Sequence, residues 1–456
     1  MFWEVLALAP FEKKEDYLEE IKTQIRCKKA KSMIIEEVEN HIEDQKNAYL
    51  SAGMEESIAM EKALVQMGDP IAVGKQLDKI HRPRMEWYLF LVVMGLSILG
   101  ILIQISLNQV ADAAGIPFFD YRKHILYLLV GIIVMFFAYF IDYTVLGRYP
   151  KLIWMLLLLG ILLYGPIAPR INGSCPYLYA YAMLFLPVFG GILYAYRKCG
   201  YFGILKCLFF SFFTVIIVRG FVVKASIYIG ILLSCLLMLS LAVWKNWFHT
   251  SKAKSLLLIW GWIFVPVLAV IFRGKLLLRS YQLSRLQKMF AILRNPGQFD
   301  QGYRMNVARQ IILHAEVFGD SLHAEGGYKT VLHSDYILTF VIGKYGLAAG
   351  ILVISLFILF IGRMIYIALK QKNALGRYVG FGCVLVYAIQ GVVYILANLS
   401  VGLFAQVNLP FISYSGASLI VNFVVLGIIL SIFRNSNIRK EEPYKKRFRI
   451  KIESIH

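Results

Sequence analysis

The sequence predicts an all-α, polytopic membrane protein with about ten transmembrane helices and a small amino-terminal helical domain. Hydrophobic residues make up 59% of the 456-residue chain, and a water-soluble protein this apolar would lack a polar surface. Apolar runs close to the ~20 residues that cross a bilayer recur from Trp87 onward. The segment before Trp87 is instead rich in charged residues. Most of the chain is therefore expected to face lipid, with one domain in water.

The amino-terminal domain is expected over residues 1–84. Its stretch EDYLEEIKTQIRCKKAKSMIIEEVENHIEDQKNAYLSAG is charged, with apolar positions at helical spacing. Turns are expected at Gly53 and at Gly68. This pattern predicts a bundle of short helices on the cytoplasmic side of the membrane.

The membrane domain is expected over 85–435, with a basic tail over 436–456. The apolar runs that fit transmembrane helices lie at 87–107, 125–142, 151–168, 177–196, 202–219, 227–244, 255–272, 336–361, 378–397 and 413–433. Boundaries predicted from a pattern are good only to a few residues. A long loop, 273–335, separates the seventh run from the eighth.

Positive charges are concentrated in alternate loops, and this asymmetry predicts the orientation. The enriched loops carry Arg148, Lys151, Arg197, Lys198, Lys245, Lys252, Lys254, Arg363, Lys370, Lys372 and Arg377. We therefore expect both termini to be cytoplasmic and the 273–335 loop to be external. The formal net charge of +20 is divided between the two membrane faces, which favours contact with anionic lipid and argues against nucleic acid.

Familiar catalytic and metal-binding motifs are missing from the sequence. The six cysteines form neither a CxxC pair nor a cluster with histidine, so neither a zinc site nor a disulfide framework is predicted. No Walker loop, GxGxxG, HExxH or GxSxG element occurs, which leaves nucleotide, serine and metal hydrolysis without support.

The external loop contains a segment that suits the membrane surface. YQLSRLQKMFAIL places Leu283, Leu286 and Phe290 on one helical face, with Arg285 and Lys288 roughly opposite. A helix lying in the plane of the interface has this pattern. Its cations can attract lipid phosphate, or can neutralise charge that develops on a pyrophosphate leaving group.

Asp335 stands at the end of this loop, directly before the eighth apolar run. One interpretation is a helix N-cap, whose carboxylate accepts hydrogen bonds from the next turn. The other is a carboxylate at the outer surface that removes a proton from a hydroxyl near the lipid headgroups. His333 either assists Asp335 or is simply a histidine at the interface.

The stretch LPFISYSGASLIVN, 409–422, opens the last apolar run. Pro410 cannot lie in a regular helix interior, so a turn is expected before the helix. The small residues Ser413, Ser415 and Ser418 either allow close helix packing or line a substrate-binding turn.

Several ordered motifs together resemble the shape, elongation, division and sporulation family of bacterial membrane proteins, the RodA/FtsW group. HSDYILTFVIGKYGLAAG resembles the family's H-T-D-F-I-F…G-E-E-L-G segment, and LPFISYSGASLIVN resembles its L-P-F-I-S-Y-G-G-S-S segment. The family's Y-Q-x-x-R…P…G-Y-Q stretch is matched at Tyr281, Gln282, Arg285, Pro296, Gly302 and Tyr303. The resemblance covers about 87–435.

The resemblance implies a peptidoglycan glycosyltransferase of the bacterial cytoplasmic membrane that polymerises lipid II, the undecaprenyl-pyrophosphate-linked disaccharide. The family's essential aspartate corresponds to Asp335, which would accept the proton of the attacking sugar hydroxyl. Residues expected to bind substrate are His333, Tyr281, Gln282, Arg285, Lys288, Ser413, Ser415 and Ser418. The expected protein partner is a class B penicillin-binding protein, a transpeptidase. No resident cofactor is expected, although a divalent cation beside Asp335 and the pyrophosphate stays open.

The chain also departs from the family pattern. The family's N-G-A-R-R-W is NGSCPY here, P-S-E-F-A-K becomes LPVFGG, and P-D-L-G-T becomes VKASIY. The two acids of G-E-E-L-G are Lys344 and Tyr345. The amino-terminal segment resembles a permease prefix domain, which ordinary members lack. These departures keep two alternatives open: a flippase for a lipid-linked precursor, and a noncatalytic scaffold for cell shape, division or sporulation.

Overall fold

The computed structural model describes residues 14–83, 85–116, 121–170, 175, 178–222, 224–261, 303–322, 328–399 and 407–436. Over these ranges the chain is helical and contains no strand, which confirms the all-α prediction. The chain forms two compact units: an amino-terminal unit that ends at Met85 and to which the described residues 433–436 also belong, and a membrane unit, Glu86–Ile432.

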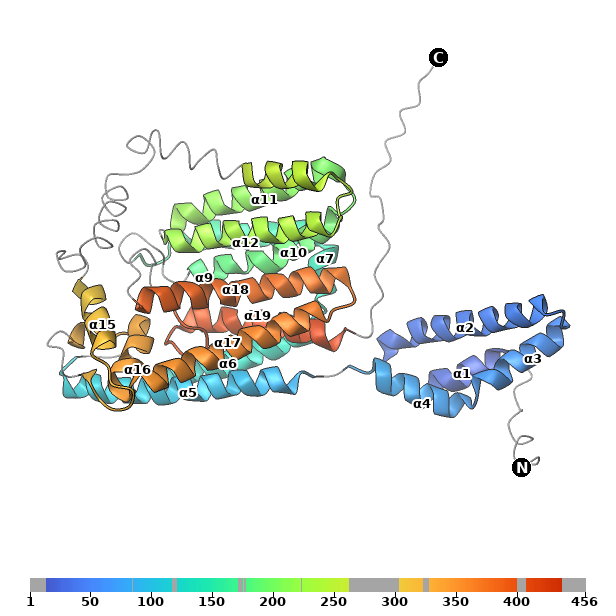
Figure 1. The fold of residues 1–456 in the computed structure, drawn as a ribbon, viewed down its shortest axis with the longest axis horizontal. Helices are drawn as coiled ribbons and strands as arrows, with labels where there is room; N and C mark the ends of the chain where they lie inside the picture. The colour runs from blue at the N-terminus through green and yellow to red at the C-terminus, as the bar shows by residue number, and fades with distance from the viewer. Residues whose placement is uncertain are drawn as a thin grey trace, which may run out of the picture. The chain divides into compact units, whose positions relative to one another are not determined.

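The amino-terminal unit is a bundle of four helices over its described residues (Figure 1). They are α1 (Lys14–Gln24), α2 (Lys28–Ser51), α3 (Glu56–Met67) and α4 (Pro70–His81). Tyr17, Ile21, Ile34 and Ile42 are almost fully buried in its core. Asp69 caps α4 by accepting hydrogen bonds from two amides of the first turn, 3.1 and 3.2 Å away.

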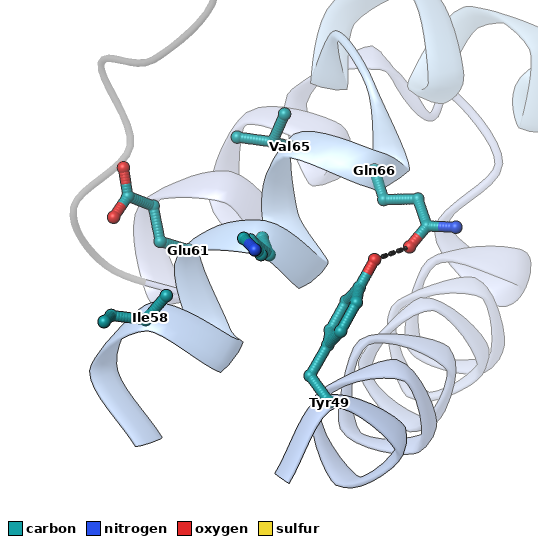
Figure 2. Close-up of a pocket in the computed structure, with 6 residues that line it drawn as sticks. Tyr49, Ile58, Glu61, Val65 and Gln66 are labelled. Carbon is teal, nitrogen blue, oxygen red and sulfur yellow. Dashed lines mark hydrogen bonds between the residues drawn. The ribbon is translucent and has the colours of Figure 1, made fainter. Parts of the chain in front are cut away.

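A groove of about 370 Å³ runs along α2 and α3 in this unit (Figure 2). It is lined by Tyr49, Ile58, Glu61, Lys62, Val65 and Gln66. The Tyr49 hydroxyl donates a hydrogen bond to the Gln66 amide oxygen across it. None of the residues predicted to form a catalytic site lines this groove.

The described part of the membrane unit contains eight helical segments long and apolar enough to cross a bilayer. They are α5 (Trp87–Ala113), α6 (Tyr121–Phe140), α9 with α10 (Leu178–Met183 and Phe185–Ala195), α11 (Gly200–Phe221), α12 (Ala225–Trp244), α17 (Leu347–Leu369), α18 (Ala374–Asn398) and α19 (Gly416–Arg434). These segments confirm a polytopic helical membrane protein.

Two of the ten predicted spans are not among these eight segments. The third corresponds to α8 (Pro150–Tyr164), which is apolar but only 15 residues long, and which follows the short helix α7 (Thr144–Arg148). The seventh is described only as far as residue 261, where the chain is still helical.

The centre of the membrane unit is formed by α10, α18 and α19. Within the apolar windows of these segments, 83%, 67% and 67% of residues are buried, against 22% in α6. Glycines let α10 and α18 touch: a Cβ on Gly190 would lie 2.7 Å from the Tyr378 carbonyl oxygen, and one on Gly382 would lie 2.5 Å from that of Leu186. Small residues at such crossings allow the close backbone packing that is common between membrane helices.

The predicted continuous helix over 336–361 is wrong. The chain instead forms a short 3₁₀ turn, η4 (Ser334–Tyr336), then the nine-residue helix α16 (Ile337–Tyr345), and only then α17. Gly346 separates α16 from α17 with a φ of 90°, a conformation that glycine adopts readily. A Cβ at Gly346 would lie 2.5 Å from the Val317 carbonyl oxygen, so the break is fixed by a distant part of the chain.

The described end of the predicted external loop packs around this break. It contains α15 (Tyr303–Leu313) and the 3₁₀ turn η3 (Tyr328–Val331), and α15 lies beside α16 (Figure 1). The Leu347 amide donates to the Glu316 carbonyl at 2.9 Å, and the Ser321 amide donates to the Gly343 carbonyl at 2.8 Å. This part of the loop is therefore built onto the helices that follow Asp335.

Candidate functional site

Asp335 lies in η4, directly before the buried helix α16. Its side chain keeps 27% of its exposure, while the neighbouring Ser334 and Tyr336 are buried. The carboxylate is thus open to solvent although the backbone on both sides is enclosed. Such a group can exchange a proton with a bound molecule.

His333 is the nearest described side chain with a titratable ring. Its Nδ1 lies 3.6 Å from Asp335 Oδ2, and the same Nδ1 is 3.4 Å from the Asp335 amide nitrogen. When Nδ1 accepts from that amide, it carries no proton and cannot donate to the carboxylate.

The structure contradicts the interpretation of Asp335 as a helix cap. The N-cap of η4 is His333, whose ring accepts the hydrogen bond from the Asp335 amide. The N-cap position of α16 is Tyr336, which makes no capping bond through its side chain. The Asp335 carboxylate has no capping role, and its position calls for another explanation.

Asn398, at the end of α18, fixes the backbone around Asp335. Its Nδ2 donates to the Asp335 carbonyl oxygen at 3.0 Å. Its Oδ1 accepts from the Thr339 amide at 3.3 Å and from the Thr339 hydroxyl at 3.2 Å. The Leu338 amide donates to the Tyr394 hydroxyl at 3.0 Å, which adds a second link from α16 to α18. The bonds to Thr339 and Leu338 are buried and the bond to Asp335 is partly buried, so α18 sets the position of Asp335.

The predicted serine cluster forms the turn before α19. Ser413 is buried, and its Oγ accepts from the Leu409 amide at 3.0 Å, closing the turn that contains Pro410. Phe411 within this turn has a φ of 67°, a strained value for a non-glycine residue. The Ser415 carbonyl oxygen accepts the Leu419 amide at 2.9 Å where α19 begins. The helix-packing interpretation accounts for these contacts, and substrate contact by these serines stays a prediction.

Ser418 belongs to a network that the sequence did not reveal. The Tyr179 hydroxyl, on α9, donates to Ser418 Oγ at 3.3 Å and accepts from Asn408 Nδ2 at 3.1 Å. The Lys224 ammonium nitrogen lies 5.0 Å from the centre of the Tyr179 ring, within cation–π range. Four separate segments thus meet around Tyr179, which hydropathy presents only as part of an apolar run.

Lys224 stands just before α12, outside the apolar segment itself. Burial lowers the pKa of its ammonium, and the negative charge of Asp335 acts in the opposite direction. The sequence held one signal for Lys224: where the family motif reads P-D-L-G-T, this chain reads VKASIY, so a lysine stands in place of the motif's aspartate.

The remaining predicted site residues lie outside the described residues. These are Tyr281, Gln282, Arg285 and Lys288, and the predicted interfacial helix lies there with them.

Two residues that depart from the family motifs, Lys344 and Tyr345, bind side chains of neighbouring segments. Lys344 Nζ lies 2.5 Å from Asp320 Oδ2, and the Tyr345 hydroxyl donates to Ser106 Oγ at 2.6 Å. Both side chains tie the end of α16 to neighbouring segments. The segment LPVFGG, 186–191, is buried in α10 and contacts α18, so no ionic side chain replaces the acid–base pair expected there.

No group of three or more His, Cys, Asp or Glu side chains suited to a metal occurs among the described residues. Asp335 offers a single carboxylate there, and Mg²⁺ takes oxygen ligands rather than an imidazole nitrogen. One carboxylate fits a Mg²⁺ ion that also binds substrate phosphates and water, and does not fit a site built from protein alone.

The apolar helices define a multi-pass membrane protein. Its eighth segment is broken, and the candidate site lies at the start of that segment. The chain belongs to the cell cycle protein family of FtsW, RodA and SpoVE, whose pattern matches residues 197–438. The "probable peptidoglycan glycosyltransferase FtsW" of Coxiella burnetii is 25% identical over 374 residues, covering 76% of this chain and 95% of the relative. Its namesake from Geobacter sp. is 24% identical and covers 76% and 97%.

Solved structures show the same fold. One comes from work on "structural coordination of polymerization and crosslinking by a peptidoglycan synthase complex" and has a TM-score of 0.61 at 17% identity, covering 77% of this chain and 98% of that one. The rod shape determining protein RodA of Thermus thermophilus has a TM-score of 0.52 at 15% identity, covering 77% and 97%.

Proposed function

We propose that this protein is a peptidoglycan glycosyltransferase that polymerises lipid II at the outer face of the bacterial cytoplasmic membrane. The observation that carries this proposal is a solvent-open carboxylate, Asp335, on a backbone that Asn398 of α18 fixes by hydrogen bonds to Asp335 and Thr339. The two relatives that this chain matches over nearly their full length are named as probable peptidoglycan glycosyltransferases, which supports the same activity.

In the proposed reaction, a sugar hydroxyl of the acceptor attacks the anomeric carbon of the donor. A new glycosidic C–O bond forms, and the bond from that carbon to the pyrophosphate oxygen breaks. The Asp335 carboxylate takes the hydroxyl proton, and undecaprenyl pyrophosphate leaves with its electron pair. Arg285 and Lys288 of the external loop are proposed to stabilise the negative charge on the leaving group.

The orientation in the membrane is part of the proposal. Lys and Arg in alternate loops favour cytoplasmic termini, which would put the start of α16 and the end of α18 on the outer side. Lipid II presents its sugars there, and Asp335 would meet them at the membrane surface.

We also propose a class B penicillin-binding protein as partner, since a solved relative comes from a complex that couples polymerisation to crosslinking. The reaction exchanges one C–O bond for another and needs no redox or group-carrying cofactor. A divalent cation, where required, would be held by Asp335 together with substrate phosphates.

The test is polymerisation of labelled lipid II by the purified full-length protein in lipid nanodiscs. We expect glycan chains from the wild type, and a rate about 10²–10⁴-fold lower from Asp335→Asn, which keeps the shape but cannot accept the proton. Asp112→Asn is the matched control, because Asp112 is an exposed carboxylate at the end of α5. Wild-type rates from Asp335→Asn would rule out the proposed role of Asp335.

A noncatalytic scaffold is the second candidate, and one observation favours it. The segment 186–191, where the family carries an acid–base pair, is apolar and buried here. A scaffold would produce no glycan from lipid II, and its Asp335→Ala variant would still complement a strain that lacks the gene.

A further inference from the structure

Lys224 occupies an unusual position for a lysine. It is the N-cap residue of α12, between the end of α11 at Phe221 and the first turn of α12. Its side chain is only partly exposed, although lysines are mostly solvent-exposed in proteins. A partly buried ammonium loses hydration, so a positive charge retained here needs a compensating partner.

The surroundings of Lys224 connect it to the candidate site. Its ammonium faces the Tyr179 ring, and the Tyr179 hydroxyl binds Ser418 and Asn408. Tyr179 is almost fully buried, so this contact surface is rigid. Lys224 is thus held by the same network that contains the turn before α19.

The negative charge of Asp335 also acts on Lys224. The Asp335 carboxylate raises the pKa of Lys224 against the larger, lowering effect of burial. An anionic ligand bound near both groups would compensate the ammonium further, and would lie within reach of the carboxylate that accepts the proton. Pyrophosphate attached to the reacting sugar has this chemistry.

No ionic side chain lies where the family motif would have supplied one on α10. There, 186–191 is apolar and packed against α18. The 186–191 segment contacts Tyr378 near the start of α18, whereas Asp335 is held by Asn398 at its end, so Lys224 brings positive charge to the site independently of that motif. A lysine suits this task, because its ammonium is a compact charge that binds phosphate from any direction.

We propose that Lys224 is a substrate-binding residue that holds the pyrophosphate of the lipid-linked donor, while Asp335 faces the acceptor hydroxyl. The proposal rests on the proposed function for the identity of the donor. The interaction itself requires only an anionic pyrophosphate lipid, so it can be measured without turnover.

The experiment compares binding of labelled undecaprenyl pyrophosphate to wild type, Lys224→Gln and Lys224→Arg in nanodiscs of neutral phosphatidylcholine. We expect Lys224→Gln to weaken binding roughly 10–100-fold, since a charge-assisted hydrogen bond is lost, and Lys224→Arg to retain most of the affinity. Lys123→Gln is the control, because Lys123 is an exposed cation in the first turn of α6. Inorganic pyrophosphate is added as competitor to separate recognition of the phosphates from recognition of the lipid chain.

Competition by inorganic pyrophosphate against wild type, and its loss in Lys224→Gln, would support the assignment. Equal affinity of wild type and Lys224→Gln would overturn it, as would equal weakening by Lys123→Gln. The elution profile and thermal unfolding of Lys224→Gln are compared with those of the wild type, so that weaker binding is not mistaken for a lost fold. Because binding is measured without lipid II turnover, absence of glycan synthesis would count against the proposed function and leave this result unaffected.

Discussion

Replacing Asn398 tests how the fold positions Asp335. Asn398→Ala removes the partner of three groups: the partly buried Asp335 carbonyl, and the buried amide and hydroxyl of Thr339. At about 1 kcal/mol for each unsatisfied group, the variant should lose about 3 kcal/mol of stability. A shift of Asp335 by about 1 Å should also lower kcat by roughly 100-fold, with a smaller change in KM.

Asn373→Ala is the matched control, since Asn373 is a buried asparagine at the other end of α18. Its Oδ1 caps the helix by accepting the Leu375 amide at 2.8 Å. Loss of a cap should cost about 1 kcal/mol and leave kcat unchanged. The assays are lipid II polymerisation kinetics and thermal unfolding followed by tryptophan fluorescence. A kcat for Asn398→Ala within twofold of wild type would refute the claim that α18 positions the carboxylate.

Three further predictions concern stability. Gly346→Ala should lower the midpoint of thermal unfolding, because alanine is strained at a φ of 90° and its Cβ would meet a carbonyl oxygen, whereas Gly362→Ala in the open part of α17 should not. Arg363→Met should destabilise the membrane unit by about 3–5 kcal/mol in chemical unfolding, since Glu86 is buried and its Oε1 lies 2.6 Å from Arg363 Nε. Asp69→Ala should speed amide hydrogen exchange in the first turn of α4, with a loss of about 1 kcal/mol; unchanged exchange there would contradict the capping bonds.

Hydropathy was sufficient to predict the class of fold, because lipid demands long apolar helices whatever their partners. It could not predict the break at Gly346. The apolar run continues through that residue, and the break depends on the Val317 carbonyl, which lies far away in the sequence. Tertiary contact therefore decided where the eighth segment divides.

The site was predictable only in part. Asp335 was found because a carboxylate beside an apolar run is conspicuous. Asn398, which binds the Asp335 carbonyl, and Tyr179, which faces Lys224, were missed, because each lies within or at the end of an apolar helix and shows no periodic signal. Lys224 looked like an ordinary loop cation until folding brought it to Tyr179.

The most direct test of the central claim is chemical rescue of the missing carboxylate. Asp335→Ala is assayed for polymerisation of lipid II in the presence and absence of sodium formate, a small carboxylate that fits the space left by the side chain. The account predicts almost no glycan without formate and partial recovery with it, while formate leaves the wild-type rate unchanged. Polymerisation by Asp335→Ala at the wild-type rate without formate would contradict the account.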